Sequence, residues 1–400
     1  MNTQRDTQYH AVCIAKDEAA HLHEWIFHHL HFGFDRIYVY LNRITDDSIS
    51  IARSIADEYP SVIFEIIDWI DWCQPSVRKH IQDIVYSYHF SKAKKTDIDV
   101  YTLYIDADEY WTPLDFKSTI REEHLAIGKP QMVSYEWLLE NGHNKPFSLL
   151  GDTLAYRESS LVKTLYKNSL TPRLFSAHKA RIKGGYKGVM ANGKRFSAQD
   201  ERRQGRVSSE QSGLKRSFIV HRIMKSEIEY LCSLVRSNPD SDLSIKMNRN
   251  GYVGQNQTGD VIEFDASLVD AYRQALAQFI SDCGLSSLIE HARINYLHQK
   301  CVLLLKVYRL GDEYRDKLEK VFRNIKDPEM KLLMKYIDDK SKKKTDRQRR
   351  LFEYLRDIAV GVEEKDIEVA HFFMTEALKL NPKGPFMIKR MKLYEERLHA

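Results

Sequence analysis

The sequence predicts an α/β fold with a mostly parallel sheet, followed by an all-α C-terminal domain. Between residues 10 and 105, short apolar runs rich in β-branched and aromatic residues alternate with longer segments of helical periodicity, which is typical of βαβ units. From about residue 267 onward the pattern is helical, with few glycines and prolines. With 400 residues, 43% of them hydrophobic, the chain is long enough for more than one domain. We therefore expect a first domain over 1–265 and a helical domain over 266–400.

Strands and helices are expected in alternation along the first part. Each expected strand is a run of apolar, β-branched or aromatic residues, and each expected helix places its apolar residues on one face, as Leu22, Trp25 and Ile26 do. The expected strands are 10–15, 36–41, 62–69 and 100–105, and the expected helices are 19–33, 48–59 and 77–94. Residues 150–265 have shorter apolar runs, which predict mixed α/β structure with loops. Residues 369–382 and the helix after them resemble one helix-turn-helix of the tetratricopeptide type.

Composition and charge exclude several classes of protein. A formal net charge of +5, from 61 basic and 56 acidic residues, is too slight for a general nucleic-acid binder. The N-terminus lacks the apolar segment of a secretory signal, and no apolar run is long enough for a transmembrane helix. The cysteines are far apart, which is typical of reduced thiols: Cys13, Cys73, Cys232, Cys283 and Cys301. We expect a cytoplasmic protein, with peripheral contact at the inner face of the membrane as a further expectation.

Polar side chains follow each expected strand of the first part. The clusters are 16–18, 42–47, Asp68 and 106–109. In parallel sheets ligands bind beyond the carboxyl ends of the strands. Polar clusters at several of these ends therefore predict a binding site at that edge of the sheet.

Asp106 and Asp108 are the strongest chemical signal in the sequence. They come directly after the apolar run 100–105, where unpaired carboxylates are costly. Carboxylate oxygens suit Mg²⁺ or Mn²⁺, and an ion bound by both residues could hold a diphosphate. The alternative is an acidic turn that caps a following helix, with Asp108 or Glu109 as the N-cap.

Two basic segments stand out from the balanced net charge. Residues 157–195 contain ten Lys or Arg and one acidic residue, Glu158, and such a cluster can stabilise phosphate charge. The alternative is a solvated basic surface or a contact with anionic lipid. Residues 331–350 contain nine basic and three acidic residues, which indicates a solvated helix or linker, with docking to a membrane surface or a partner as the alternative.

Ordered motifs over about residues 8–235 resemble family-2-type glycosyltransferases with the GT-A fold, most of all the subgroup related to glycosyltransferase family 92. The matching residues are Lys16, Glu18, Glu24, Trp25, His29, Gly33, Asp35, Asn42, Asp46, Gln82, 104–109, Trp137 with 141–143, and His221 with 225–227. The chain departs from the family pattern at three places. Asp17 replaces an asparagine, Arg222 replaces a tyrosine, and Leu139-Glu140 replaces Phe-Gly. These departures bear on the acceptor side more than on the donor side.

The resemblance implies a GT-A-like nucleotide-binding sandwich that moves a sugar from a nucleotide-sugar donor to a hydroxyl of a glycan or glycolipid, in the synthesis of bacterial surface polysaccharide. It implies that Mn²⁺ or Mg²⁺ is held by Asp106, Asp108 and His221. The donor would be held by Glu18, Asn42, Asp46, Asp68, Gln82 and Asp106, to which we add Lys163 of the basic segment 157–195. For His221 the alternative is a hydrogen-bonded core histidine after the apolar run 218–220.

Family-2-like enzymes usually invert the sugar, and inversion needs a general base near the acceptor. Our candidates are Asp200 and Glu140, with Glu201 as a third. Two other functions remain open at this point. One is a non-catalytic scaffold that binds nucleotide and uses its helical domain for partners, and the other is a metal-dependent nucleotidyltransferase or phosphohydrolase.

Overall fold

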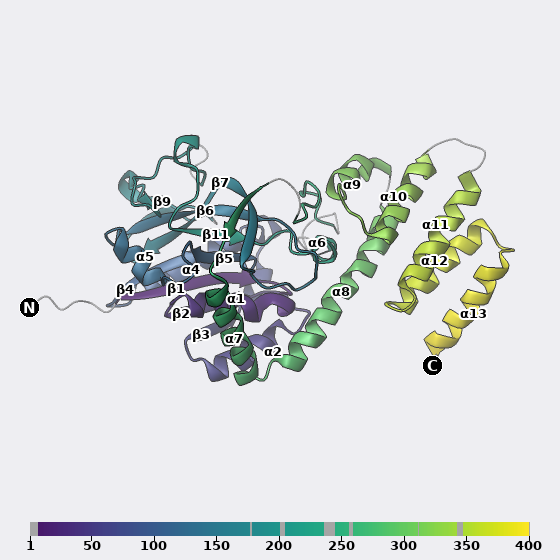
Figure 1. Cartoon of the computed structure of the whole chain (residues 1–400), viewed down its shortest axis with the longest axis horizontal. Helices are drawn as coiled ribbons and strands as arrows, with labels where there is room; N and C mark the ends of the chain where they lie inside the picture. The colour runs from purple at the N-terminus through teal and green to yellow at the C-terminus, as the bar shows by residue number, and fades with distance from the viewer. Residues whose placement is uncertain are drawn as a thin grey trace, which may run out of the picture. The chain divides into compact units, whose positions relative to one another are not determined.

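The computed structural model describes residues 7–176, 178–200, 205–235, 245–255, 259–310, 312–341 and 347–399. These residues form two compact units, each drawn in Figure 1. Unit 1 takes its residues from 1–141, 147–223 and 257–293, and unit 2 takes its residues from 142–146, 224–256 and 294–400. Within the described ranges, none of the helices combines the length and the apolar character that crossing a membrane requires.

Unit 1 is built on a mixed sheet. Its first part is parallel, in the order β3-β2-β1-β4. These strands are β1 (Thr7–Ala15), β2 (Arg36–Leu41), β3 (Val62–Ile66) and β4 (Asp99–Tyr104). Because Ala15 pairs with Leu41, and Leu41 with Ile66, the carboxyl ends of β1, β2 and β3 lie at one edge.

The second part of the sheet continues from β4 in the order β7-β6-β11-β5. These strands are β5 (Glu109–Pro113), β6 (Met132–Glu140), β7 (Thr153–Lys167) and β11 (Ser217–His221), while β10 (Val189–Met190) pairs with β6 and β12 (Asp260–Glu263) pairs with β7. Strand β7 is antiparallel to both β4 and β6, and β11 is parallel to β6 but antiparallel to β5. The expectation of a mostly parallel sheet therefore holds for the first four strands only. Strands β6 and β7 follow each other without a crossover helix, and a direct connection of this kind favours antiparallel pairing.

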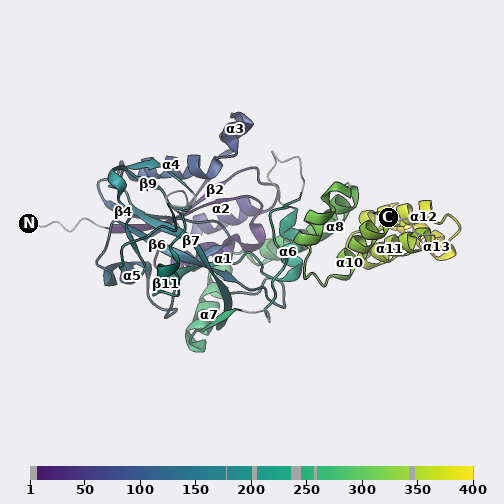
Figure 2. The ribbon, with the colours of Figure 1, turned by 90° about the horizontal axis from the view of Figure 1, so that it is seen from above.

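Helices cover both faces of the parallel part. Along β1, alternate side chains enter different cores: Ala11 and Cys13 pack with α1 and α2, whereas Val12 packs with α4. This is the two-residue period of a strand buried on both faces. Figure 2 shows α4 and α7 on opposite sides of the sheet. The helices of this unit are α1 (Ala19–His31), α2 (Ser48–Glu58), α3 (Pro75–Arg78), α4 (Ile81–Ala93), α5 (Ile120–Ala126) and α7 (Ala266–Asp282), with short 3-10 turns η1 (Asp68–Trp72), η2 (Lys183–Gly185) and η3 (Ser209–Gln211) and a separate hairpin of β8 (Pro172–Leu174) and β9 (Arg181–Ile182).

Helix α7 belongs to unit 1, so the expected domain boundary after residue 265 falls inside this unit. Tyr272 and Phe279 of α7 pack against Phe27 of α1, with ring centroids 5.2 and 5.4 Å apart. The long helix α8 (Ser286–Arg309) begins in unit 1 and continues in unit 2 after Arg293. The change in sequence pattern places the boundary after residue 265, whereas packing places it after Arg293.

Unit 2 is mainly helical. In its C-terminal part α10 packs on α11, α11 on α12 and α12 on α13, as antiparallel helix pairs joined by short turns do. The pair α12 and α13 is the helix-turn-helix expected after residue 369. The remaining bounds are α6 (Glu227–Leu234), η4 (Asp312–Tyr314), α9 (Arg315–Val321), α10 (Pro328–Ser341), α11 (Arg347–Val362), α12 (Ile367–Leu380) and α13 (Pro385–His399).

Candidate functional site

An acidic turn, residues 106–109, joins β4 to β5 at the edge of the sheet. The Trp25 side chain of α1 fixes the turn, because its Nε1 donates to the carbonyl oxygens of Asp106 and Glu109 at 3.1 and 2.8 Å. Within the turn, the amide of Glu109 donates to the Asp106 carbonyl at 3.0 Å. The turn leads into strand β5 and not into a helix, so the alternative reading of Asp108 or Glu109 as a helix N-cap does not apply.

The carboxylate of Asp106, whose side chain is 30% exposed, is bound by two protein partners. Gln82 of α4 donates to its Oδ1 at 2.7 Å, and Lys163 of β7 donates to its Oδ2 at 3.1 Å. Lys163 is fully buried and also contacts Oε2 of the fully buried Glu109 at 3.0 Å. Burial raises the pKa of Glu109 to about 8, and the nearby Asp106 adds to this rise while Lys163 opposes it. Gln82 and Lys163, expected near the donor, are thus direct partners of Asp106.

Asp108 points to a different partner. Its Oδ2 lies 3.4 Å from Nε2 of His221, the last residue of β11, and its side chain is 30% exposed. Burial lowers the pKa of His221, but the charges of Asp108, Glu109 and Asp106 outweigh burial, and the pKa lies above its ordinary 6.5. Antiparallel pairing of His221 with Glu109 explains the contact, because it sets the end of β11 beside the acidic turn. His221 is therefore a buried histidine and a neighbour of Asp108 at once.

Aromatic rings flank this pair. The Trp137 ring of β6 lies 4.3 Å from the His221 ring and 5.1 Å from the His178 ring, measured between centroids. The amino group of Lys163 lies 5.7 Å from the same indole ring. Trp137 lies in one of the sequence motifs, which assigns it no role. His178 was not predicted as a site residue, because nothing in the sequence around residue 178 distinguishes it from a loop histidine.

Asp108 and His221 offer two ligands to a divalent ion. Within the parts of the chain that the structure describes, no three His, Cys, Asp or Glu side chains form a ready-made metal site. Mg²⁺ and Mn²⁺ bound with phosphates commonly keep several waters and take only one or two protein carboxylates. A partly exposed carboxylate beside an imidazole fits an ion of this kind, whereas both oxygens of Asp106 already have protein partners.

The other strand ends lie along the same edge. Asn42 follows β2, and its amide lies 3.4 Å from Oδ1 of Asp68, which follows β3. Glu18 follows β1. Burial raises the pKa of the Cys13 thiol, and the charges of Asp106 and Glu18 add to this rise. Asp46 has a structural role instead: its oxygens accept the amides of Ala19 and Ser48, each at 2.9 Å, at the starts of α1 and α2.

Two of the residues that depart from the family pattern, Glu140 and Arg222, form a buried ion pair. Arg222 Nε donates to Glu140 Oε2 at 2.8 Å, and Arg222 Nη1 donates to Glu24 Oε1 at 2.7 Å. The Glu140 side chain is 2% exposed. A general base must reach a substrate proton, so this placement argues against Glu140 as the base. Asp200 lies on the surface, and Glu201 is outside the described residues.

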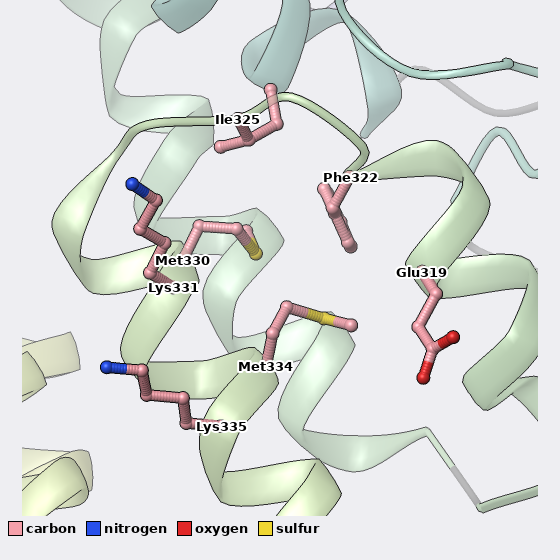
Figure 3. A pocket seen from close by; sticks show the side chains of 7 residues that line it. All are labelled: Glu319, Phe322, Ile325, Met330, Lys331, Met334 and Lys335. Carbon is pink, nitrogen blue, oxygen red and sulfur yellow. The ribbon is translucent and has the colours of Figure 1, made fainter.

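The basic segment 157–195 does not form one surface. Lys163 and Lys179 are buried, whereas most of the others are exposed: Arg173, Arg181, Lys183, Lys187, Lys194 and Arg195. Two lysines of the second segment, Lys331 and Lys335, line a pocket of about 390 Å³ in unit 2. Figure 3 shows that its other walls are Phe322, Ile325, Met330, Met334 and Glu319. The first part of the basic segment 331–350 is helical, because it belongs to α10.

No model of a known protein family matches the chain, and no curated protein matches its sequence.

Proposed function

We propose that the chain is a metal-dependent glycosyltransferase of GT-A-like architecture, which moves a sugar from a nucleotide-sugar donor to a hydroxyl of a glycan or glycolipid. The observation that supports this best is the 3.4 Å pair of Asp108 and His221 beside the acidic turn after β4. In open α/β sheets ligands bind outside the carboxyl ends of the strands. A second support is the set of ordered motifs in the sequence.

In this proposal Asp108 and His221 hold Mn²⁺ or Mg²⁺, which when bound neutralises charge on the departing diphosphate. Asp106 orients the acidic turn and does not bind the ion, because its two carboxylate oxygens accept hydrogen bonds from Gln82 and Lys163. The Trp137 ring forms an apolar wall next to His221. The protein thus contributes placement and charge at the bond that breaks.

The nucleoside would lie along the ends of β1, β2 and β3. Glu18, Asn42 and Asp68 follow these strands, and carboxylates and amides can pair with ribose hydroxyls and base edges. The base that activates the acceptor hydroxyl is not Glu140 in this proposal, since Arg222 already binds that carboxylate. Asp200 remains a candidate from the sequence.

The test is turnover of a panel of nucleotide sugars by the purified protein with Mn²⁺ and with EDTA. We expect release of a nucleoside diphosphate that depends on the metal and is lost in Asp108→Ala. The matched control is Asp57→Ala, which removes an exposed carboxylate of α2. Full turnover by Asp108→Ala, or by the wild type in excess EDTA, would refute the metal-dependent mechanism.

The products separate this function from the two alternatives. A nucleotidyltransferase or phosphohydrolase releases pyrophosphate or phosphate in place of a nucleoside diphosphate. A scaffold binds nucleotide, and its thermal stability rises with the ligand, but no donor in the panel turns over.

A further inference from the structure

The side chain of Arg222, next to His221 in the sequence, lies in the interior of unit 1. It is 3% exposed, and each of its three nitrogens donates a hydrogen bond. Nε reaches Glu140 at 2.8 Å, Nη1 reaches Glu24 at 2.7 Å, and Nη2 reaches the carbonyl of Ser148 at 2.6 Å. A planar guanidinium with this many partners has one orientation only.

These contacts join the elements that surround the acidic turn. Glu24 belongs to α1, which also holds the turn through Trp25, and Glu140 is the last residue of β6. The guanidinium lies 5.5 Å from the ring centre of Tyr110, the second residue of β5. The backbone amide of Arg222 donates to the carbonyl of Asp108 at 2.9 Å. One residue thus ties α1, β5 and β6 to the turn.

The side chains of His221 and Arg222 have different partners: His221 contacts Asp108, and Arg222 contacts Glu24 of α1. His221 pairs with Glu109 on one side and Leu139 on the other, and its imidazole points to Asp108. The contacts of Arg222 lead to α1 instead. If the guanidinium lost its anchors, the end of β11 could rotate, and His221 would move away from Asp108.

We propose that Arg222 is a positioning residue, which fixes the separation of Asp108 and His221 through its buried pairs with Glu24 and Glu140. That the site binds a metal ion and a nucleotide rests on the proposed function. That Arg222 fixes the positions of Asp108 and His221 does not depend on it. Groups behind a metal ligand commonly change metal affinity by about 10- to 100-fold when they are removed. A buried ion pair need not add stability, and we assign this one a role in placing the side chains of Asp108 and His221.

The test compares two variants with a matched control. Arg222→Met/Glu24→Gln/Glu140→Gln removes all three charges together, so that no carboxylate is left buried without its cation. Arg222→Lys keeps the charge but cannot bind both carboxylates with one planar fork, and it serves if the triple variant does not fold. The control is Lys300→Met/Asp327→Asn/Glu329→Gln, which neutralises a similar buried lysine between two carboxylates in unit 2.

The first measurement is backbone hydrogen exchange of peptides that cover 104–113 and 217–223. We expect faster exchange in the triple variant, because the backbone amide of Arg222, which donates to the Asp108 carbonyl, is no longer held in place by its side chain. We expect a smaller effect in Arg222→Lys and no change in the control. The second measurement is binding of Mn²⁺ together with UDP, GDP or CDP. We expect about tenfold weaker binding in the triple variant and partial recovery in Arg222→Lys.

Unchanged exchange in a folded variant would overturn the inference, and so would faster exchange with unchanged Mn²⁺–nucleotide affinity. If the wild type binds none of these probes, the proposed function fails, and the exchange measurement alone then decides the inference. In that case faster exchange confined to the two peptides supports positioning, and unchanged exchange refutes it.

Discussion

The imidazole Nε2 of His221 lies 3.4 Å from Oδ2 of Asp108, although the two residues belong to distant parts of the chain. Asp108 follows the parallel part of the sheet, and His221 ends a strand of the mixed part. The contact exists because β11 is antiparallel to β5 and its end meets the acidic turn. The mixed half of the sheet therefore completes a site that the parallel half begins.

If Asp108 and His221 hold one ion, their effects on metal binding are coupled. We expect Asp108→Asn and His221→Gln each to weaken the binding of Mn²⁺ with a nucleoside diphosphate by about tenfold or more, and the double variant to bind no more weakly than the worse single variant. Isothermal titration calorimetry measures the three affinities. The control is Asp57→Asn on the exposed side of α2. Strictly additive losses would show that the two side chains act separately.

Lys163 is expected to be essential for stability, because it lies fully buried between the carboxylates of Asp106 and Glu109. Removing one member of a buried charged group costs about 3–5 kcal/mol. We expect a loss of this size in the free energy of unfolding of Lys163→Met, measured with urea at pH 9, above the pKa of about 8 that burial gives Glu109. Lys163→Met/Glu109→Gln should recover part of it, since a neutral amide then replaces the buried carboxylate of Glu109, whereas the Asp106 side chain is 30% exposed.

The control for this loss is Lys92→Met. Its amino group makes an exposed ion pair with Glu65 at 3.0 Å, and exposed pairs contribute about 1 kcal/mol or less. If Lys163→Met costs no more than Lys92→Met, the charges around Asp106 are better solvated than the structure indicates.

Trp25 connects α1 to the acidic turn through two hydrogen bonds to backbone carbonyls. Trp25→Phe removes this donor from both carbonyls. The Asp106 carbonyl keeps the amide of Glu109 as its donor, whereas the loss of the buried bond to the Glu109 carbonyl costs about 1–3 kcal/mol. We expect a lower free energy of unfolding together with weaker binding of Mn²⁺ and nucleotide. Trp72→Phe is the control for the indole-to-phenyl change, because Trp72 is 92% exposed. Reduced stability with unchanged binding would show that the turn keeps its shape without Trp25.

Local pattern predicted most elements of the first part. The strand expected over 62–69 is too long, because β3 ends at Ile66 and the 3-10 turn η1 begins at Asp68. The expected strand 36–41 coincides with β2, and the helix expected over 19–33 is α1, which ends at His31. The helix expected over 77–94 is instead α3 and α4 with a turn between them, because apolar periodicity does not record a short interruption. The order of the later strands could not be predicted, since it depends on which distant strands pair.

The site was predictable only where its residues are close in the sequence. Asp106 and Asp108 share one turn after an apolar strand, and the sequence pattern shows them directly. The partners of the site come from other strands: Lys163 is 57 residues from Asp106, and Arg222 is 82 residues from Glu140. In the sequence, Lys163 is one member of a basic segment, and Arg222 and Glu140 are departures from family motifs. Only the pairing of β6, β7 and β11 shows that they are ion-pair partners.

Lys179 is buried, and within the described ranges its amino group contacts a carbonyl, a hydroxyl, a thioether and an aromatic ring, but no carboxylate. Its Nζ donates to the carbonyl of Lys187 at 2.8 Å and lies 4.3 Å from the ring centre of Phe196. Burial, together with the charge of Lys187, lowers its pKa to about 7. The native protein therefore disfavours the charged form of this lysine.

This lowered pKa predicts how stability depends on pH. An unfolded lysine has a pKa of about 10.4, so between about pH 7 and pH 10 the unfolded chain binds more protons at this position than the native chain. Lys179 therefore makes the free energy of unfolding rise with pH in this window. In Lys179→Met this contribution is absent, so the variant should show a smaller rise than the wild type in urea unfolding at several pH values. Lys167→Met, which removes a lysine paired with Asp99 at 2.8 Å, should retain the rise, and parallel profiles for wild type and Lys179→Met would contradict a neutral buried lysine.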